Sequence, residues 1–210
     1  MHLKRNVWAV IIMVGLGLIM TTHVQAGTSD NIFSDWQGKF ISREFVNVAP
    51  EMDAVYEKVA VEAKKMGKNY TVAQIRHFFK KMIHTDCQSI SLKGDTIVFY
   101  APNKNAVTHQ YKSTGTIADT YKDYKFEWYA FEAVDKAAVF SAYRYIIMLK
   151  IHQHENSQPH FHFRYGNKGG NALTQGTDTK NWWPTMVKPD FDLASYIKSI
   201  NPKIMAKVLP

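Results

Sequence analysis

The segment SISLKGDTIVFY, residues 89–100, decides the fold class of this chain. Two runs rich in β-branched and aromatic residues flank a Lys-Gly-Asp turn signal, so the segment predicts a β-hairpin. Three similar stretches follow it, THQYKSTGTIADTY, YKFEWYAFEAV and FSAYRYIIMLKI, and glycine or charged residues separate them. Five or six consecutive short strands indicate an antiparallel meander, which closes into a barrel or packs as a sandwich.

Helices are expected before and after this meander in the sequence. Residues 48–67 and 71–84 each place apolar side chains three and four positions apart, which predicts two amphipathic helices. The second has Thr71 and Gln74 at capping-box spacing. A short helix should begin near Asp192, a good N-cap residue. The expected fold class is therefore α+β and mainly β, an antiparallel barrel with two helices packed on it.

The first 26 residues have the layout of a secretory signal peptide. Lys4 and Arg5 precede an apolar run at 7–20, and small residues then lead to Ala26. The run is shorter than an ordinary membrane span. We therefore expect cleavage after Ala26, export of the mature chain and no stable membrane insertion of it. Residues 27–210 should form a single domain.

Composition excludes several classes of protein. The formal net charge is +8 over 210 residues, but the lysines are scattered, so a nucleic-acid partner is not expected. The single cysteine, Cys87, excludes an internal disulfide and is expected to pack as a small hydrophobic side chain. A chain of this length can bury a core without covalent staples.

The segment HQHENSQPHFHF, residues 152–163, holds four of the nine histidines in two His-x-His pairs. If residues 155–159 form a five-residue hairpin loop, His154 faces His160 and His152 faces His162 across the ladder. Side chains alternate along a strand, so all four imidazoles then share one face, with opposed Cβ atoms about 4.5–5.5 Å apart. This pattern predicts a metal site made of histidine, which suits zinc, copper or nickel.

The surrounding residues favour holding a metal over using it in catalysis. The alternation with Phe161 and Phe163 indicates that the opposite face of the strand is packed. Glu155 is the only acid close in sequence, and no nucleophile elbow, phosphate loop or cysteine pair is present. We therefore do not expect an enzyme. A carrier of a small apolar ligand and a zinc-dependent hydrolase remain the alternatives. The isolated histidines are expected to be structural or surface residues; they are His77, His84 and His109.

Several segments together resemble the ZinT (YodA) family of periplasmic zinc-binding proteins. They are SDWQGKF near the start of the mature chain, TVAQIRHFFKKMIHTDCQSISLKGDTIVFY, the strand before the histidines, HFHFRYGN and NWWPTM. The resemblance spans roughly residues 33 to 200. It implies a lipocalin-type barrel of the calycin class, with a zinc ion held at the open end by three histidines.

Two of the ligands implied by the resemblance match His160 and His162, and His152 is the nearest match to the third. The loop before HFH is one residue shorter than in the family, so the choice between His152 and His154 stays open, with His154 or water completing the tetrahedron. The implied role is to bind zinc, and sometimes cadmium or other divalent ions, and to hand zinc to a periplasmic component of a zinc uptake transporter. A histidine-rich stretch common after the family's signal peptide is absent here.

Overall fold

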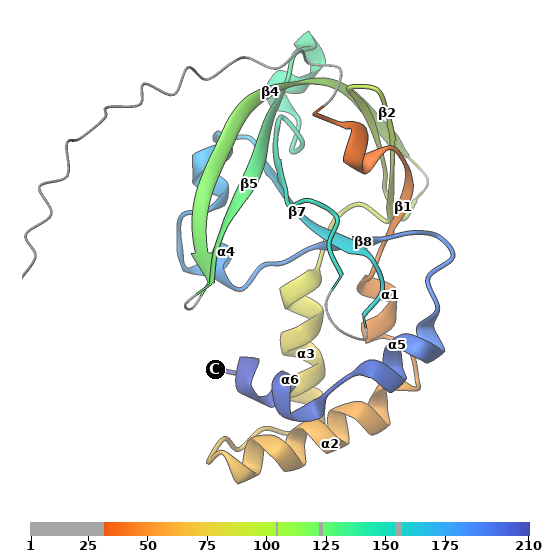
Figure 1. Cartoon of the computed structure of the whole chain (residues 1–210), viewed down its shortest axis with the longest axis vertical. Helices are drawn as coiled ribbons and strands as arrows, with labels where there is room; N and C mark the ends of the chain where they lie inside the picture. The colour runs from red at the N-terminus through yellow and green to blue at the C-terminus, as the bar shows by residue number, and fades with distance from the viewer. Residues whose placement is uncertain (1–31, 104, 122–123, 154–156) are drawn as a thin grey trace, which may run out of the picture.

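The computed structural model describes residues 32–103, 105–121, 124–153 and 157–210 (Figure 1). Within these residues eight antiparallel strands close into a barrel, because each strand pairs with the next and the last pairs with the first. The strands are β1 Gly38–Ser42, β2 Ser89–Lys93, β3 Thr96–Tyr100, β4 Ala106–Tyr121, β5 Tyr124–Ala133, β6 Tyr145–Met148, β7 His160–Gly166 and β8 Thr185–Val187.

The hairpin expected at residues 89–100 is present, with Gly94 in its turn at a φ of +61°. The six consecutive strands β2–β7 confirm the expected meander, but not all of them are short, and two further strands, β1 and β8, complete the barrel. Strand β4 is 16 residues long, and its register shifts between Ser113 and Gly115. Strand β8 is only three residues long and begins within the NWWPTM segment, whose tryptophans and proline are more typical of a loop. It is a strand because it pairs with β7 on one side and β1 on the other, which local sequence cannot show.

The interior of the barrel is filled with aromatic side chains. Trp36 is fully buried and donates a hydrogen bond from its indole to the carbonyl of Leu149 at 2.9 Å. Phe40 and Phe161 meet edge to face with ring centroids 5.0 Å apart. A barrel of eight strands has an interior just wide enough for side chains to fill it. Because side chains fill the interior of the barrel, we expect the functional site on its outside or at its ends.

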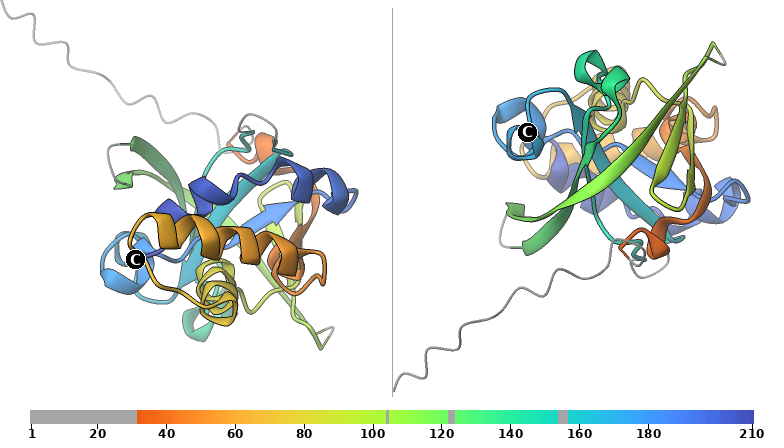
Figure 2. Two further views of the ribbon diagram at one scale, coloured as in Figure 1. Left: turned by 90° about the horizontal axis from the view of Figure 1, so that it is seen from below. Right: turned by 90° about the horizontal axis from the view of Figure 1, so that it is seen from above.

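Helices cover one end of the barrel, as the view from below shows (Figure 2). The two expected helices are present, and the Thr71–Gln74 capping box forms. The helix after Asp192 is also present, and the Asp192 carboxylate accepts a hydrogen bond from the amide of Ser195. A further C-terminal helix packs on the first long one and shares a second core with it. The helices are α1 Glu44–Asn47, α2 Met52–Lys65, α3 Val72–Ile83, α4 Thr177–Lys180, α5 Leu193–Ser199 and α6 Pro202–Val208.

His109 on β4 belongs to a hydrogen-bonded cluster with Asp135 and Ser141. Its Nδ1 lies 3.0 Å from the Asp135 carboxylate and its Nε2 lies 2.8 Å from the Ser141 hydroxyl oxygen. The Ser141 oxygen also accepts the amide N–H of Tyr143 at 3.1 Å. The 3-10 helix η3 (Lys136–Phe140) lies between Asp135 and Ser141. The cluster therefore ties β4 to the connection between β5 and β6, and His109 has the structural role expected of it.

The remaining residues singled out in the sequence lie in ordinary positions. His77 is exposed on α3, and His84, also exposed, pairs with Glu44 at 3.0 Å. Cys87 is buried, and burial raises the pKa of its thiol to about 12, so it packs as an inert apolar side chain. Two more 3-10 helices are η2 (Ser34–Trp36) and η4 (Gly170–Leu173). Of the helices in the described ranges, none combines the length and the apolar character that crossing a bilayer requires.

Candidate metal centre

The described residues of the histidine-rich segment pair in a register that differs from the expected one. His152 and His160 make an antiparallel bridge, with N–H···O distances of 2.9 Å and 3.0 Å in the two directions. His152 therefore faces His160 and not His162. His154, expected opposite His160, lies outside the described residues, as does Glu155.

The chain just before His160 is held by hydrogen bonds to the start of α5. The side-chain amide of Gln158 donates a hydrogen bond to the carbonyl of Asp192 at 2.5 Å and accepts one from the Asp192 amide at 2.8 Å. Gln158 is thus attached to the start of α5. Among the described residues of this segment, His160 pairs with His152, and the expected loop at 155–159 lies partly outside the described residues.

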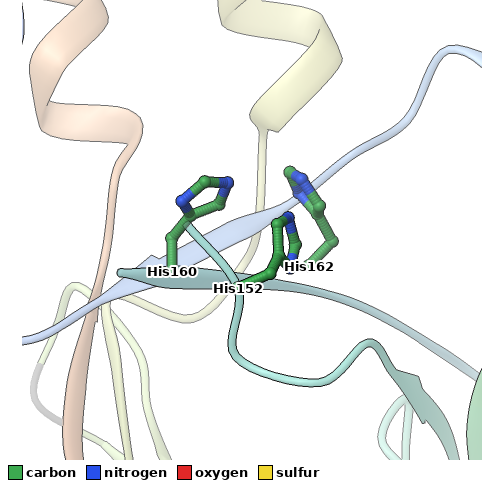
Figure 3. A group of neighbouring side chains, drawn as sticks. All are labelled: His152, His160 and His162. Atoms are coloured by element: carbon green, nitrogen blue, oxygen red, sulfur yellow. The ribbon is translucent and has the colours of Figure 1, made fainter. Parts of the chain in front are cut away.

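Three imidazole rings converge at the start of β7. Donor nitrogens of His152, His160 and His162 all lie within 4.8 Å of one another. The rings project from the same side of the strand, toward the ends of the helices (Figure 3). The intervening Phe161 and Phe163 belong to the barrel core. Because side chains alternate along a strand, the histidines lie on the outer face of the barrel, on the side covered by helices.

Backbone carbonyls orient the first two rings. His152 Nδ1 lies 2.9 Å from the carbonyl oxygen of Lys150, and His160 Nδ1 lies 2.9 Å from that of Gln158. A carbonyl oxygen can only accept a hydrogen bond, so Nδ1 carries the proton in both rings. In the neutral imidazole the lone pair then lies on Nε2, the nitrogen available to a metal.

A hydroxyl orients the third ring. His162 Nδ1 lies 3.0 Å from Thr185 Oγ1, and the Thr185 hydroxyl donates its own proton to the carbonyl of Trp183 at 2.9 Å. The hydroxyl oxygen therefore accepts from His162 Nδ1, which again leaves the lone pair on Nε2. Outer-shell partners of this kind fix the tautomer and the orientation of metal-binding histidines.

Burial keeps His162 in the neutral form. Its pKa lies well below the usual value, because burial penalises the charged ring and because His160, Arg43 and His152 add unfavourable positive charge. Among the described residues no aspartate or glutamate joins the three histidines in the cluster. Three neutral nitrogen donors with one open position match the requirements of a tetrahedral zinc site. A carboxylate general base for metal-assisted hydrolysis is not part of this cluster.

Two cavities adjoin the histidines. One of about 400 Å³ lies toward α3, α5 and α6 and includes His160 and His162 in its lining. The other, of about 360 Å³, includes His152, His162, Trp183 and aromatic side chains of the β4–β5 hairpin. Arg43 lines both. The NWWPTM segment contributes only to the family resemblance, so no local sequence pattern assigns a role to Thr185 or Trp183, and none points to Arg43.

The family follows from comparison of the sequence with known families. A family model described as "ZinT (YodA) periplasmic lipocalin-like zinc-recruitment" matches residues 19–200. The chain belongs to the ZinT family. This confirms the resemblance, the lipocalin-like barrel and the zinc-recruiting class, and it places the chain among zinc-binding carriers and not among enzymes.

Two solved structures of Streptococcus pneumoniae AdcA show a similar fold. The Zn(II)-bound ZinT-like domain of AdcA has a TM-score of 0.58 at 22% identity, over 87% of this chain and 92% of that domain. Zn(II)-bound AdcA has a TM-score of 0.60 at 22% identity, over 83% of this chain. The match spans only 34% of the AdcA chain, so this ZinT protein corresponds to about a third of it. No match was found among curated proteins.

Proposed function

We propose that this ZinT protein binds zinc through Nε2 of His152, His160 and His162. The observation that carries the proposal is the orientation of all three rings. Each Nδ1 is tied to an oxygen, so three lone pairs are presented from rings that converge on one point. His154 is then not needed as a ligand, although it was a candidate. Imidazole donors also accept other divalent ions, so cadmium is a further expected cargo.

We infer further that the protein acts in the periplasm as a zinc buffer or carrier. The family is described as periplasmic, and the first 26 residues have the pattern of a cleaved signal peptide, which leaves residues 27–210 as the working domain. The proposed recipient of the zinc is a periplasmic component of a zinc uptake transporter. The described role of the family in zinc recruitment supports this partner.

Single alanine variants test the ligand set. We expect His152→Ala, His160→Ala and His162→Ala each to weaken zinc binding by about 100-fold or more, since losing a ligand should cost more than the 10–100-fold lost with an outer-shell partner. Zinc affinity is measured by competition with a chromophoric chelator. Elemental analysis of the His160→Ala plus His162→Ala double variant should find no retained zinc.

His77→Ala and His154→Ala serve as comparisons. His77 is an exposed histidine on α3, so its loss should leave zinc affinity unchanged. His154→Ala should also leave it within about threefold. If zinc affinity falls strongly in His154→Ala but is retained in His152→Ala, then His154 and not His152 is the third ligand. A wild-type protein that binds no zinc would remove the proposal altogether.

A further inference from the structure

Arg43 is a cation placed beside the three histidines. It follows β1 and precedes α1, and its guanidinium lies over the ring of Tyr196 at 5.2 Å. It shares the lining of both adjoining cavities with His162. Among the described residues that line the two adjoining cavities, Arg43 is the only permanently charged one. In the part of the chain that the structure describes, no carboxylate lies within ion-pair distance of the Arg43 side chain.

The second cavity has an aromatic wall next to this cation. The ring of Trp183 lies 5.4 Å from that of His162, and it continues to Phe126 at 5.9 Å and Tyr121 at 5.2 Å, centroid to centroid. Tyr124, at the end of the β4–β5 hairpin, is largely exposed and completes the wall. The volume of this second cavity, about 360 Å³, falls within the range of small-molecule sites. Such sites are mostly apolar, with a few convergent polar groups.

Charge determines what can enter as the fourth ligand. Three neutral imidazoles leave the full charge of a bound zinc ion uncompensated, and Arg43 adds another positive charge close by. In a partly buried site such charges interact far more strongly than in water. An anion in the fourth position offsets both, whereas a water molecule offsets neither. A carboxylate can accept hydrogen bonds from a guanidinium in addition to binding a metal.

We propose that the zinc-loaded protein takes a small organic carboxylate with an aromatic or otherwise apolar body as its fourth ligand. The carboxylate lies between the metal and Arg43, and the body packs against the aromatic wall formed by Tyr121, Tyr124, Phe126 and Trp183. This inference rests on the proposed zinc site. It makes the protein a carrier of zinc together with an organic acid, and the acid is the part that the sequence does not indicate.

Phenylacetate, phenylacetamide and acetate are suitable probes, because they separate the charge from the apolar body. Zinc affinity of the wild type is measured first. Each probe is then titrated into the zinc-loaded protein by calorimetry and into the Co²⁺-loaded protein by visible absorption, which changes when a ligand enters the inner coordination shell. We expect phenylacetate to bind at least about tenfold more tightly than either phenylacetamide or acetate, and to change the cobalt spectrum.

Two variants test the roles of the cation and the wall. Arg43→Gln should weaken phenylacetate binding by roughly tenfold to hundredfold while zinc is still bound, because it removes a charged hydrogen-bond donor. Tyr124→Ala should weaken binding of phenylacetate but not of acetate, and a substitution at this exposed position should leave the fold unchanged. Arg76→Gln is the matched control, because Arg76 also lies over a tyrosine ring, that of Tyr56, but lines neither cavity, and it should change neither.

The outcomes separate this inference from the zinc site. Retained zinc with no preference for phenylacetate over phenylacetamide overturns the organic-acid inference and leaves the zinc site intact. So does an Arg43→Gln variant that binds phenylacetate as tightly as wild type. A protein that fails to bind zinc at all overturns both.

Discussion

A hydrogen bond at Nδ1 of each imidazole decides which of its nitrogens carries the lone pair. For His152 and His160 the acceptor is the carbonyl two residues earlier in the chain, at Lys150 and Gln158. These contacts are local in sequence. For His162 the partner is Thr185, which is 23 residues away and reaches the ring only because β7 and β8 pair. The third imidazole therefore depends on tertiary structure more than the other two.

Thr185→Val tests this dependence. The variant keeps the shape of the side chain but removes the acceptor for His162 Nδ1, so the ring can change tautomer or rotate. We expect zinc affinity to fall about 10-fold to 100-fold, the usual cost of losing an outer-shell partner. The measurement is a chelator competition titration at neutral pH.

Thr174→Val is a matched control, because the hydroxyl of Thr174 also donates to a backbone carbonyl but lies outside the histidine cluster. It should leave zinc affinity unchanged. Equal affinities for Thr185→Val and wild type would mean that the tautomer of His162 is set by some other contact.

At the scale of the element, strand β7 shows what a pattern in the sequence can predict. The alternation of histidine and phenylalanine correctly indicated one packed face and one face carrying the imidazoles, because the period of a strand is two. The pairing partner of each histidine could not be read in the same way. It depends on pairing between segments, which places His152 opposite His160, and Gln158, just before His160, contacts Asp192 at the start of α5.

The cluster around His109 is a second element-scale feature that can be tested. In His109→Leu the Asp135 carboxylate and the Ser141 hydroxyl lose their common partner. We expect the free energy of unfolding to fall by about 1–3 kcal/mol, the cost of leaving such groups without a hydrogen bond. Denaturant unfolding of the zinc-free protein measures it.

His77→Leu is the control for this change, because His77 is exposed, and it should alter stability by less than about 0.5 kcal/mol. Zinc affinity should be unchanged in both variants, since neither residue is in the three-histidine cluster. A stability loss of the same size in both would argue against a structural role for the His109 cluster.

On the scale of the whole molecule, the histidine cluster lies between the barrel and the helices. The barrel supplies the rings through β7 and the bridge at His152, and α3, α5 and α6 contribute to the lining of the adjoining cavity. A bound ion would join the segment around residue 152 to β7. Zinc binding should therefore stabilise the whole fold, since a ligand that binds only the folded state adds to its free energy of unfolding.

Thermal unfolding with and without zinc, at several pH values, tests this coupling. At a free zinc concentration 100 times Kd the gain at pH 7 should be about 2.7 kcal/mol. Protons compete with zinc for the same nitrogens, so the stabilisation by zinc should shrink as pH falls through the ordinary histidine range. Because the pKa of His162 is lowered, that ring is neutral at pH 7 and carries no proton on Nε2 for zinc to displace. A zinc effect that does not vary between pH 7 and pH 5 would contradict ligation by imidazole.

From the chain of amino acids one can read the two long helices, the hairpin at 89–100, the β-rich class and the histidine-rich strand. These features are local, because periodicity, capping and turn residues act over a few positions. The short strand β8, the register at His160, and the positions of Thr185 and Arg43 could not be read in that way. Each depends on contacts between segments far apart in the chain, and such contacts form only when the barrel closes and the helices pack against it.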